Sequence, residues 1–344
     1  ESHPKSTTKN VESESGSSLA KITQKTSRKR KNESESENSS APKRRSERIA
    51  SQDSDLASVI HDLRLRSTFS SYGVEDLPSS AYKLYKFKIR DMEALKVNFL
   101  GASTENAVIP DIEATIPEKY VLPDIDSELL GNPKFNVVKI DGLTDEEVQT
   151  FVDKLHDVVL NGVQVVGTDE TFTDTLVDDL LRITKLNNWP LKIRNHPLCK
   201  LYIEDEPCVS SDSEFVIKMR NLAILVYKHL KNVGYGTNFG ESQIAVEILA
   251  CGSENIRSLG ASPTDQTLWA VRVITTYVTF YKTTIPVKYW GELAKGLPQE
   301  EVKVQRWPAE NGLITGFDLA TPRGRRSVLT GLAKIREFLK QQPP

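Results

Sequence analysis

The chain has 344 residues, of which 38% are hydrophobic and 27% charged, and its formal net charge is −2. This length and apolar content are enough for one large buried core or two smaller ones. No run approaches about 18 apolar residues, so we expect no transmembrane helix and no membrane partner. The three cysteines, Cys199, Cys208 and Cys251, are odd in number and form no CxxC pair, which argues against a disulfide framework and a structural zinc site.

Residues 1–55 are predicted to form a disordered tail. They are rich in Ser, Lys, Arg and Glu and nearly free of aromatic side chains, so they cannot bury enough apolar surface to fold. They hold 12 Lys/Arg and 9 Asp/Glu residues, a net charge of +3, which leaves −5 for the rest of the chain. The folded part is therefore not basic overall, and nucleic-acid binding there needs a local basic patch.

Two basic clusters in this tail resemble a bipartite nuclear-import signal. Eleven residues separate the two clusters, which consist of Arg28, Lys29, Arg30 and Lys31, and of Lys43, Arg44 and Arg45. An extended peptide with this spacing can place each cluster in its own acidic groove of an import receptor. We therefore expect a nuclear protein with an import-receptor partner. The alternatives are a solubilising tail and a loose nucleic-acid-binding arm.

Residues 56–134 form a predicted N-terminal extension. Its later part, from 108 to 133, shows neither helical nor strand periodicity and contains four prolines, Pro110, Pro117, Pro123 and Pro133. Such a stretch is typical of an irregular connection. The boundary of the main domain is therefore predicted at about residue 135.

From residue 135 the apolar pattern becomes regular and predicts alternating strands and helices. A strand is expected over 135–140. A capping box, with Thr144 at the N-cap and Glu147 three residues later, then begins a helix that ends near Leu160. The further expected elements are a helix at about 173–186, strands at 190–195, 198–204, 214–219 and 222–229, a helix at 241–250, strands at 268–276 and 277–285, a helix at 287–297, strands at 302–307 and 316–319, and a helix at 323–340.

The stretch 203–229 combines acidic residues with a buried strand. Asp212 stands just before the expected strand 214–219, and Lys228 stands near the end of the apolar strand 222–229. A carboxylate on one strand of a hairpin and a lysine late on the next can face a common site. Phosphodiester hydrolysis uses such a pair, because a carboxylate holds Mg²⁺ and a lysine orients the attacking water.

This arrangement resembles the core of the PD-(D/E)XK, or restriction-endonuclease-like, superfamily. In that family an Asp begins the second core strand, and a carboxylate, one variable residue and a Lys follow on the third. Asp212 matches the Asp and Lys228 matches the Lys, whereas Val226 stands where the second carboxylate belongs. The resemblance implies an α/β domain over residues 135–344, with a mixed central sheet flanked by helices. The carboxylate missing at Val226 is a direct metal ligand in the family.

The resemblance suggests further site residues on the neighbouring helices. The family's helix before the core strands often supplies an acidic residue, for which Glu170 or Asp174 is the candidate. The helix after them often places a polar Gln beside the site, here Gln243, and Glu247 one turn later could replace the carboxylate lost at Val226. The simpler interpretation is that each acidic residue is an ordinary solvated helical position.

Three arginines, Arg323, Arg325 and Arg326, fall in the first turn of the final expected helix. The helix dipole disfavours cations there. This cluster predicts either a phosphate contact or a solvated first turn.

Two functions remain in competition. In the first, the chain is a Mg²⁺-dependent nuclease acting on DNA in the nucleus, with Asp212 and Glu247 as metal ligands and Lys228, Glu170 and Gln243 completing the site. In the second, the fold is retained, catalysis is lost because of Val226, and the domain binds nucleic acid or a protein. A scaffold protein without a site is the third, simplest possibility. The import tail joined to a nuclease-like domain also resembles the crinkler-type effector proteins of eukaryotic microbes.

Overall fold

The computed structural model describes residues 89–163, 169–219, 221–229, 238–258 and 264–342. The predicted tail 1–55, its import signal and the start of the predicted extension, up to residue 88, lie outside the described residues. The helices and strands in chain order are α2 (Ile89–Ala94), β1 (Val97–Gly101), η1 (Glu105–Ala107), η2 (Glu118–Tyr120), α3 (Ser127–Leu130), η3 (Val137–Lys139), α4 (Glu146–Val163), α5 (Glu170–Ile183), β2 (Lys192–Asn195), β3 (Leu198–Ile203), β4 (Glu206–Asp212), β5 (Phe215–Met219), β6 (Asn221–His229), α6 (Glu241–Ser258), β7 (Gln266–Ile274), β8 (Tyr277–Ile285), α7 (Val287–Leu293), β9 (Val302–Trp307), β10 (Phe317–Asp318) and α8 (Pro322–Gln341).

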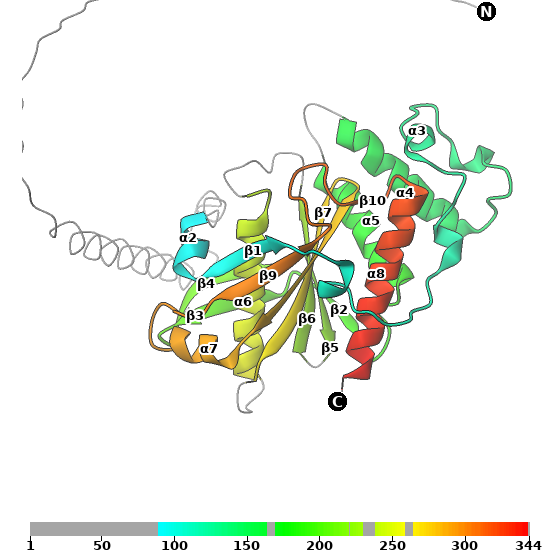
Figure 1. The fold of residues 1–344 in the computed structure, drawn as a ribbon. Coiled ribbons are helices and arrows are strands. Elements are labelled where there is room, and N and C mark those ends of the chain that lie inside the picture. Colours follow the sequence, from blue (N-terminus) through cyan, green and yellow to red (C-terminus); the bar gives the residue numbers. More distant parts are fainter. Residues whose placement is uncertain (1–88, 164–168, 220, 230–237, 259–263, 343–344) are drawn as a thin grey trace, which may run out of the picture. The chain divides into compact units, whose positions relative to one another are not determined.

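An eight-stranded mixed sheet forms the centre of the described structure (Figure 1). Its strands lie in the order β1-β9-β8-β7-β6-β5-β2, and β10 pairs with β8 beside this path. The pairs β1–β9 and β6–β7 are parallel, and the other pairs are antiparallel. Helix α6 lies between β6 and β7 in the chain, which agrees with the crossover that parallel neighbours require. The prediction of an α/β protein with a mixed central sheet flanked by helices is thus confirmed.

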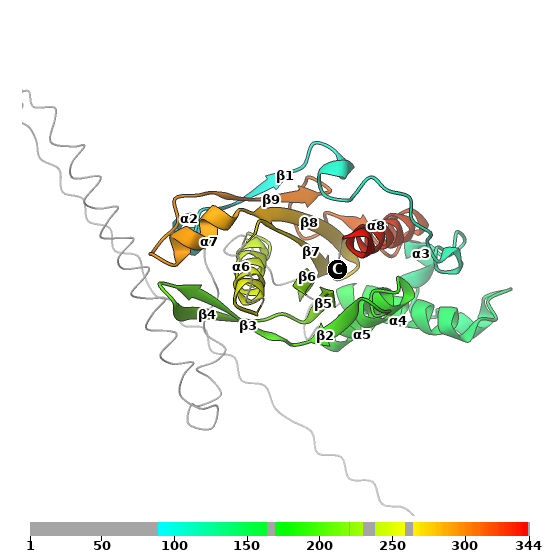
Figure 2. The same cartoon turned by 90° about the horizontal axis from the view of Figure 1, so that it is seen from below.

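Helices cover both faces of the sheet and divide its apolar side chains into two cores. We call the core formed with α4, α5 and α8 the first core, and the core formed with α6 and α7 the second core. Figure 2 shows α6 between the main sheet and the hairpin of β3 and β4. On β6, Val226 belongs to the first core and its neighbour Leu225 to the second, because successive strand residues point to opposite faces.

The segment 97–134 packs on the same sheet and cores as the later strands. Strand β1 forms the sheet edge next to β9, and Ile109, Tyr120 and Leu130 are buried in the first core. The four prolines noted in the sequence thus lie in an irregular segment, residues 108–133, which we call the strap. The strap runs along the sheet and across α8 (Figure 1).

Arg325 attaches this strap to α8. Its guanidinium is fully buried and donates to the backbone carbonyls of Val121 at 2.9 Å, Leu122 at 2.9 Å and Leu319 at 2.8 Å, and to that of Ile125. Burial lowers the pKa of this guanidinium to about 10, so it keeps its charge at neutral pH.

Arg325 therefore differs from both sequence-based interpretations, whereas Arg323 and Arg326 are exposed, as a solvated first turn predicts. Arg325 is neither solvated nor open to a phosphate, since its donors are taken by carbonyls. Arg326 forms a two-point ion pair with Glu118, with both nitrogen–oxygen distances at 2.8 Å. The cluster fixes the strap rather than offering a free anion site at these two residues.

The start of α8 also lies against β10. Thr321 caps the helix by accepting a hydrogen bond from the Gly324 amide at 3.0 Å, and Pro322 lies at the first helical position. A Cβ atom at residue 324 would lie 1.9 Å from the carbonyl oxygen of Asp318. The close approach therefore requires glycine.

Three local predictions were wrong. Residues 135–140 hold the 3-10 helix η3 instead of a strand, because Asn136 caps it through the Val138 amide. The cap of α4 is Asp145, which accepts from the amides of the second and third residues after it, and not Thr144. Strand β4 was missed, because the acidic cluster forms a two-residue turn with positive φ at Glu204 and Asp205, where Asn-Gly is the usual signal.

None of the described helices is both long enough and apolar enough to cross a membrane.

Candidate functional site

Strands β5 and β6 position the two residues that carry the family resemblance. Phe215 pairs with Val226 in antiparallel register. Asp212 ends β4, three residues before Phe215, and Lys228 lies two residues beyond Val226. Continued in this register, the backbone brings Asp212 and Lys228 to the same end of the β5–β6 pair. The side chains of both residues lie outside what the structure describes.

Val226 occupies the position of the expected second carboxylate. Its side chain is 1% exposed and belongs to the first core, together with Ile224 on the same strand and Leu180 on α5. A metal ion needs oxygen ligands and room for its remaining water. The surroundings of Val226 are apolar, so this position supplies no ligand.

Glu247, the candidate replacement, lies in the second core. It is 4% exposed on α6, and its Oε2 atom has no hydrogen-bond partner. Burial raises its pKa to about 8, and the nearby charge of Glu214 adds to this effect, whereas the side chains of Ser213 and Gln243 oppose it. A carboxyl with this pKa holds a proton at neutral pH.

The two candidate carboxylates on helices are therefore not brought together. Glu170 is exposed at the first turn of α5, which packs into the first core. Glu247 lies on α6, on the opposite face of the sheet. Glu247 lies beside Ser213, the residue that follows Asp212. Gln243 is half-buried one turn before Glu247.

The described residues do not fit a magnesium ion at this place. Val226 is apolar and buried, and the Glu247 carboxyl is protonated and lies across the sheet. Among the side chains that the structure describes, which leave out those of Asp212 and Lys228, no three His, Cys, Asp or Glu residues converge to hold an ion.

A buried polar network, which the sequence pattern did not reveal, fastens the start of α6. Glu241 is fully buried and forms an ion pair with Arg306, and its other oxygen accepts from Asn238 at 2.8 Å. Arg272 donates to the Phe239 carbonyl at 2.8 Å and to Asn311 at 2.7 Å. Burial raises the pKa of Glu241, and Arg306 opposes that shift. One feature of the sequence could have pointed to this network, since Arg272 is an arginine inside the apolar run of β7.

Two thiols meet next to Glu247. The Sγ atoms of Cys199 on β3 and Cys251 on α6 are 3.4 Å apart, and both residues are buried. The hydrogen bond from Cys251 lowers the pKa of the Cys199 thiol. All three cysteines are free thiols.

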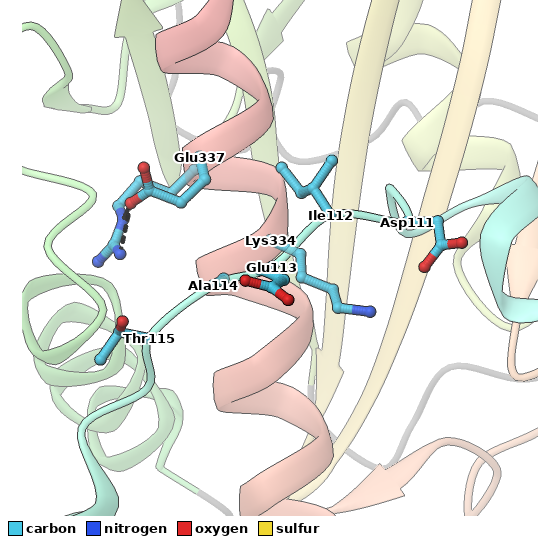
Figure 3. Close-up of a pocket in the computed structure, with 8 residues that line it drawn as sticks. Asp111, Ile112, Glu113, Ala114, Thr115, Lys334 and Glu337 are labelled. Carbon is cyan, nitrogen blue, oxygen red and sulfur yellow. Dashed lines mark hydrogen bonds and ion pairs between the residues drawn. The ribbon is translucent and has the colours of Figure 1, made fainter.

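A shallow cavity of about 860 Å³ lies away from all these residues. It is bounded by the extended strap 111–115 and by Lys334, Arg336 and Glu337 of α8 (Figure 3). Arg336 is engaged there, since it donates to the Thr184 carbonyl at 2.8 Å and pairs with Glu337. None of the predicted site residues lines this cavity.

The chain matches no protein-family model, and no curated protein shows significant similarity to it.

Proposed function

We propose that this chain carries a restriction-endonuclease-like domain that has lost phosphodiester hydrolysis and acts in the nucleus by binding nucleic acid. The observation that carries the proposal is Val226, an apolar residue 1% exposed in the first core. It stands two residues before Lys228, where the family places a metal-binding carboxylate. Loss of one of two ligating carboxylates weakens divalent-metal binding strongly, because the charge of the ligands sets the affinity.

The order of helices and strands along the chain supports the proposed restriction-endonuclease-like fold. A helix, α5, precedes the core strands, Asp212 stands just before β5, and Lys228 lies near the end of β6. A further helix, α6, follows β6 and carries Gln243. This order agrees with the family resemblance.

The nuclear part of the proposal rests on the tail. The clusters at 28–31 and 43–45 have the spacing of a bipartite import signal, and an import receptor would be the partner. The crinkler-type resemblance stays a prediction of the same kind.

A Mg²⁺-dependent nuclease acting on DNA is the second candidate. One observation favours it, since Glu247 lies beside Ser213, next to Asp212 in the chain. Its raised pKa of about 8 and its place in the second core weigh against its role as the missing ligand.

A plasmid assay with the full chain tests the choice between them. We expect the chain to retard plasmid DNA in a gel and to leave it uncut in Mg²⁺ or Mn²⁺. Metal-dependent nicking that disappears in Asp212→Ala would overturn the proposal in favour of the nuclease. Failure to bind any DNA or RNA would remove the nucleic-acid part.

A gain-of-ligand variant tests the site itself. Val226→Glu restores the family carboxylate, and Val226→Gln gives a neutral control of the same shape. We expect calorimetry to show Mg²⁺ binding in the Glu variant and none in the Gln variant. Equal behaviour of the two variants would count against a shared site with Asp212.

A further inference from the structure

An exposed tryptophan and four basic residues gather where α5 leads into β2. Trp189 is 92% exposed, the largest exposed fraction of the large hydrophobic side chains in the described chain. Lys185, Lys192 and Arg194 are exposed, and Lys218 is half-buried. We call these five residues the β2 edge patch.

The backbone holds the patch together. The loop that carries Lys185 and Trp189 is fastened to β2, because the Ile193 amide donates to Asn187 at 3.0 Å and the Leu191 amide donates to Asn188 at 2.9 Å. Strand β2 is the outermost strand of the main sheet. The loop that carries the tryptophan is therefore fixed against the strand at the sheet edge.

The three cations on strands β2 and β5 share one face of this edge. Lys192 and Arg194 alternate with Ile193, whose side chain packs on the first core, so they point to the other face. Lys218 pairs directly with Lys192 across β5 and β2. Like charges directly opposite each other repel, so this lysine pair destabilises the sheet edge unless an anion binds over it.

The described part of the chain does not neutralise these charges. Within the described ranges, no carboxylate lies within ion-pair distance of Lys185, Lys192, Arg194 or Lys218, whereas Arg182, one turn before this loop, is paired with Asp178 at 2.8 Å. The chain after the tail is acidic as a whole, since residues 56–344 carry a net charge of −5. The patch is thus a local basic surface of the kind that nucleic-acid binding requires in such a chain.

We infer that the β2 edge patch binds single-stranded nucleic acid, with a base stacked on Trp189 and phosphates at Lys192, Arg194 and Lys218. Side chains two apart on a strand are about 7 Å apart, which lets them contact successive phosphates of an extended strand. An aromatic side chain beside a cationic track is the usual means of binding single strands without sequence preference. An acidic peptide would use the cations alone and leave Trp189 in water.

This inference rests on the proposed function, because it names the surface where the proposed nucleic-acid-binding domain would contact its ligand. The patch does not overlap the family site. Lys218 pairs with Leu222 near the start of β6, whereas Lys228 lies at the other end of that strand.

Fluorescence anisotropy with a labelled 12-nucleotide oligo-dT and the full chain tests the inference over a range of salt concentrations. We expect Trp189→Ala to weaken binding about 10-fold at an unchanged salt slope, because a base stack carries no charge. We expect Lys192→Ala/Arg194→Ala to lower the slope of log K against log salt by about 1.4, at about 0.7 per lost phosphate contact. The tail contributes equally to all variants.

Matched controls separate the patch from general surface effects. Ile314→Ala removes another exposed hydrophobic side chain, 76% exposed, and Lys139→Ala/Lys295→Ala removes two exposed lysines elsewhere. Neither is expected to change affinity or slope. Each variant is checked for an unchanged thermal midpoint.

The remaining outcomes are distinct. Wild-type affinity in both patch variants would overturn the inference and leave the proposed function standing, with the nucleic acid bound elsewhere. An effect of the lysine and arginine changes without an effect of Trp189→Ala, together with equal competition by polyglutamate, would overturn it in favour of an acidic peptide. Binding at the patch followed by metal-dependent cleavage would support the inference and refute the proposed function.

Discussion

The carboxyl of Glu247 makes the pH dependence of stability a direct test of the second core. The perturbation is Glu247→Gln, which keeps the shape and removes the titration. In the folded chain burial raises the pKa from 4.5 to about 8. The folded state therefore holds a proton that the unfolded state releases between these two values.

The sign and size follow from proton linkage. The stability that protonated Glu247 contributes is fully present below about pH 4.5 and is lost as pH rises through about 8. The shift of about 3.5 pKa units corresponds to about 5 kcal/mol over the whole range. Between pH 5 and pH 7 the wild type should lose about 2.5 kcal/mol relative to Glu247→Gln.

The assay is urea denaturation of both proteins at pH 5, 6 and 7, followed by the fluorescence of the buried Trp269 and Trp290. Glu170→Gln, at an exposed position of α5, controls for the loss of one carboxylate. The neighbours Glu214 and Cys199 are present in all proteins compared. A stability difference between wild type and Glu247→Gln that stays constant from pH 5 to pH 7 would refute the burial of a protonated carboxyl on α6.

Three further changes test the packing that positions the site. Arg325→Ala should lower the free energy of unfolding by about 3 kcal/mol or more, because backbone carbonyls lose their buried donor. The control Arg326→Ala, at an exposed ion pair, should leave the urea midpoint nearly unchanged. Similar midpoints for both variants would contradict the anchoring role of Arg325. Gly324→Ala should lower the free energy of unfolding by about 3 kcal/mol or more, because its Cβ clashes with backbone. The control Gly291→Ala, whose Cβ meets nothing within 4 Å, should be neutral or stabilise the chain by about 0.5–1 kcal/mol. Calorimetric melting distinguishes the two variants. Glu241→Ala should cost about 3–5 kcal/mol, since it leaves a buried arginine unpaired, and a chemical denaturation midpoint within error of the wild type would rule out a desolvated ion pair.

Much of the fold could be predicted from local patterns. The helices α4, α5, α6 and α8 and the strands from β5 to β9 appear where apolar periodicity placed them, because the periods of 3.6 and 2 are written in the residues of each segment.

Partners along the sheet edge could not be predicted. Strand β1 pairs in parallel with β9, some 200 residues away in the chain, and nothing in a five-residue strand identifies a distant partner. A strand exposes the same donors and acceptors to any neighbour. The sequence placed the domain boundary near residue 135, whereas tertiary pairing extends the sheet to residue 97.

The candidate site shows most clearly which features the sequence determines and which depend on the tertiary structure. The sequence by itself determined that Asp212 and Lys228 flank one hairpin and that Val226 stands where the family resemblance predicts a carboxylate. The tertiary structure decided the state of Glu247, a helical glutamate that looks solvated in the sequence and is 4% exposed in the fold. The reason is that residue type fixes what a side chain can do, whereas its pKa and its partners depend on burial by segments far away in the chain.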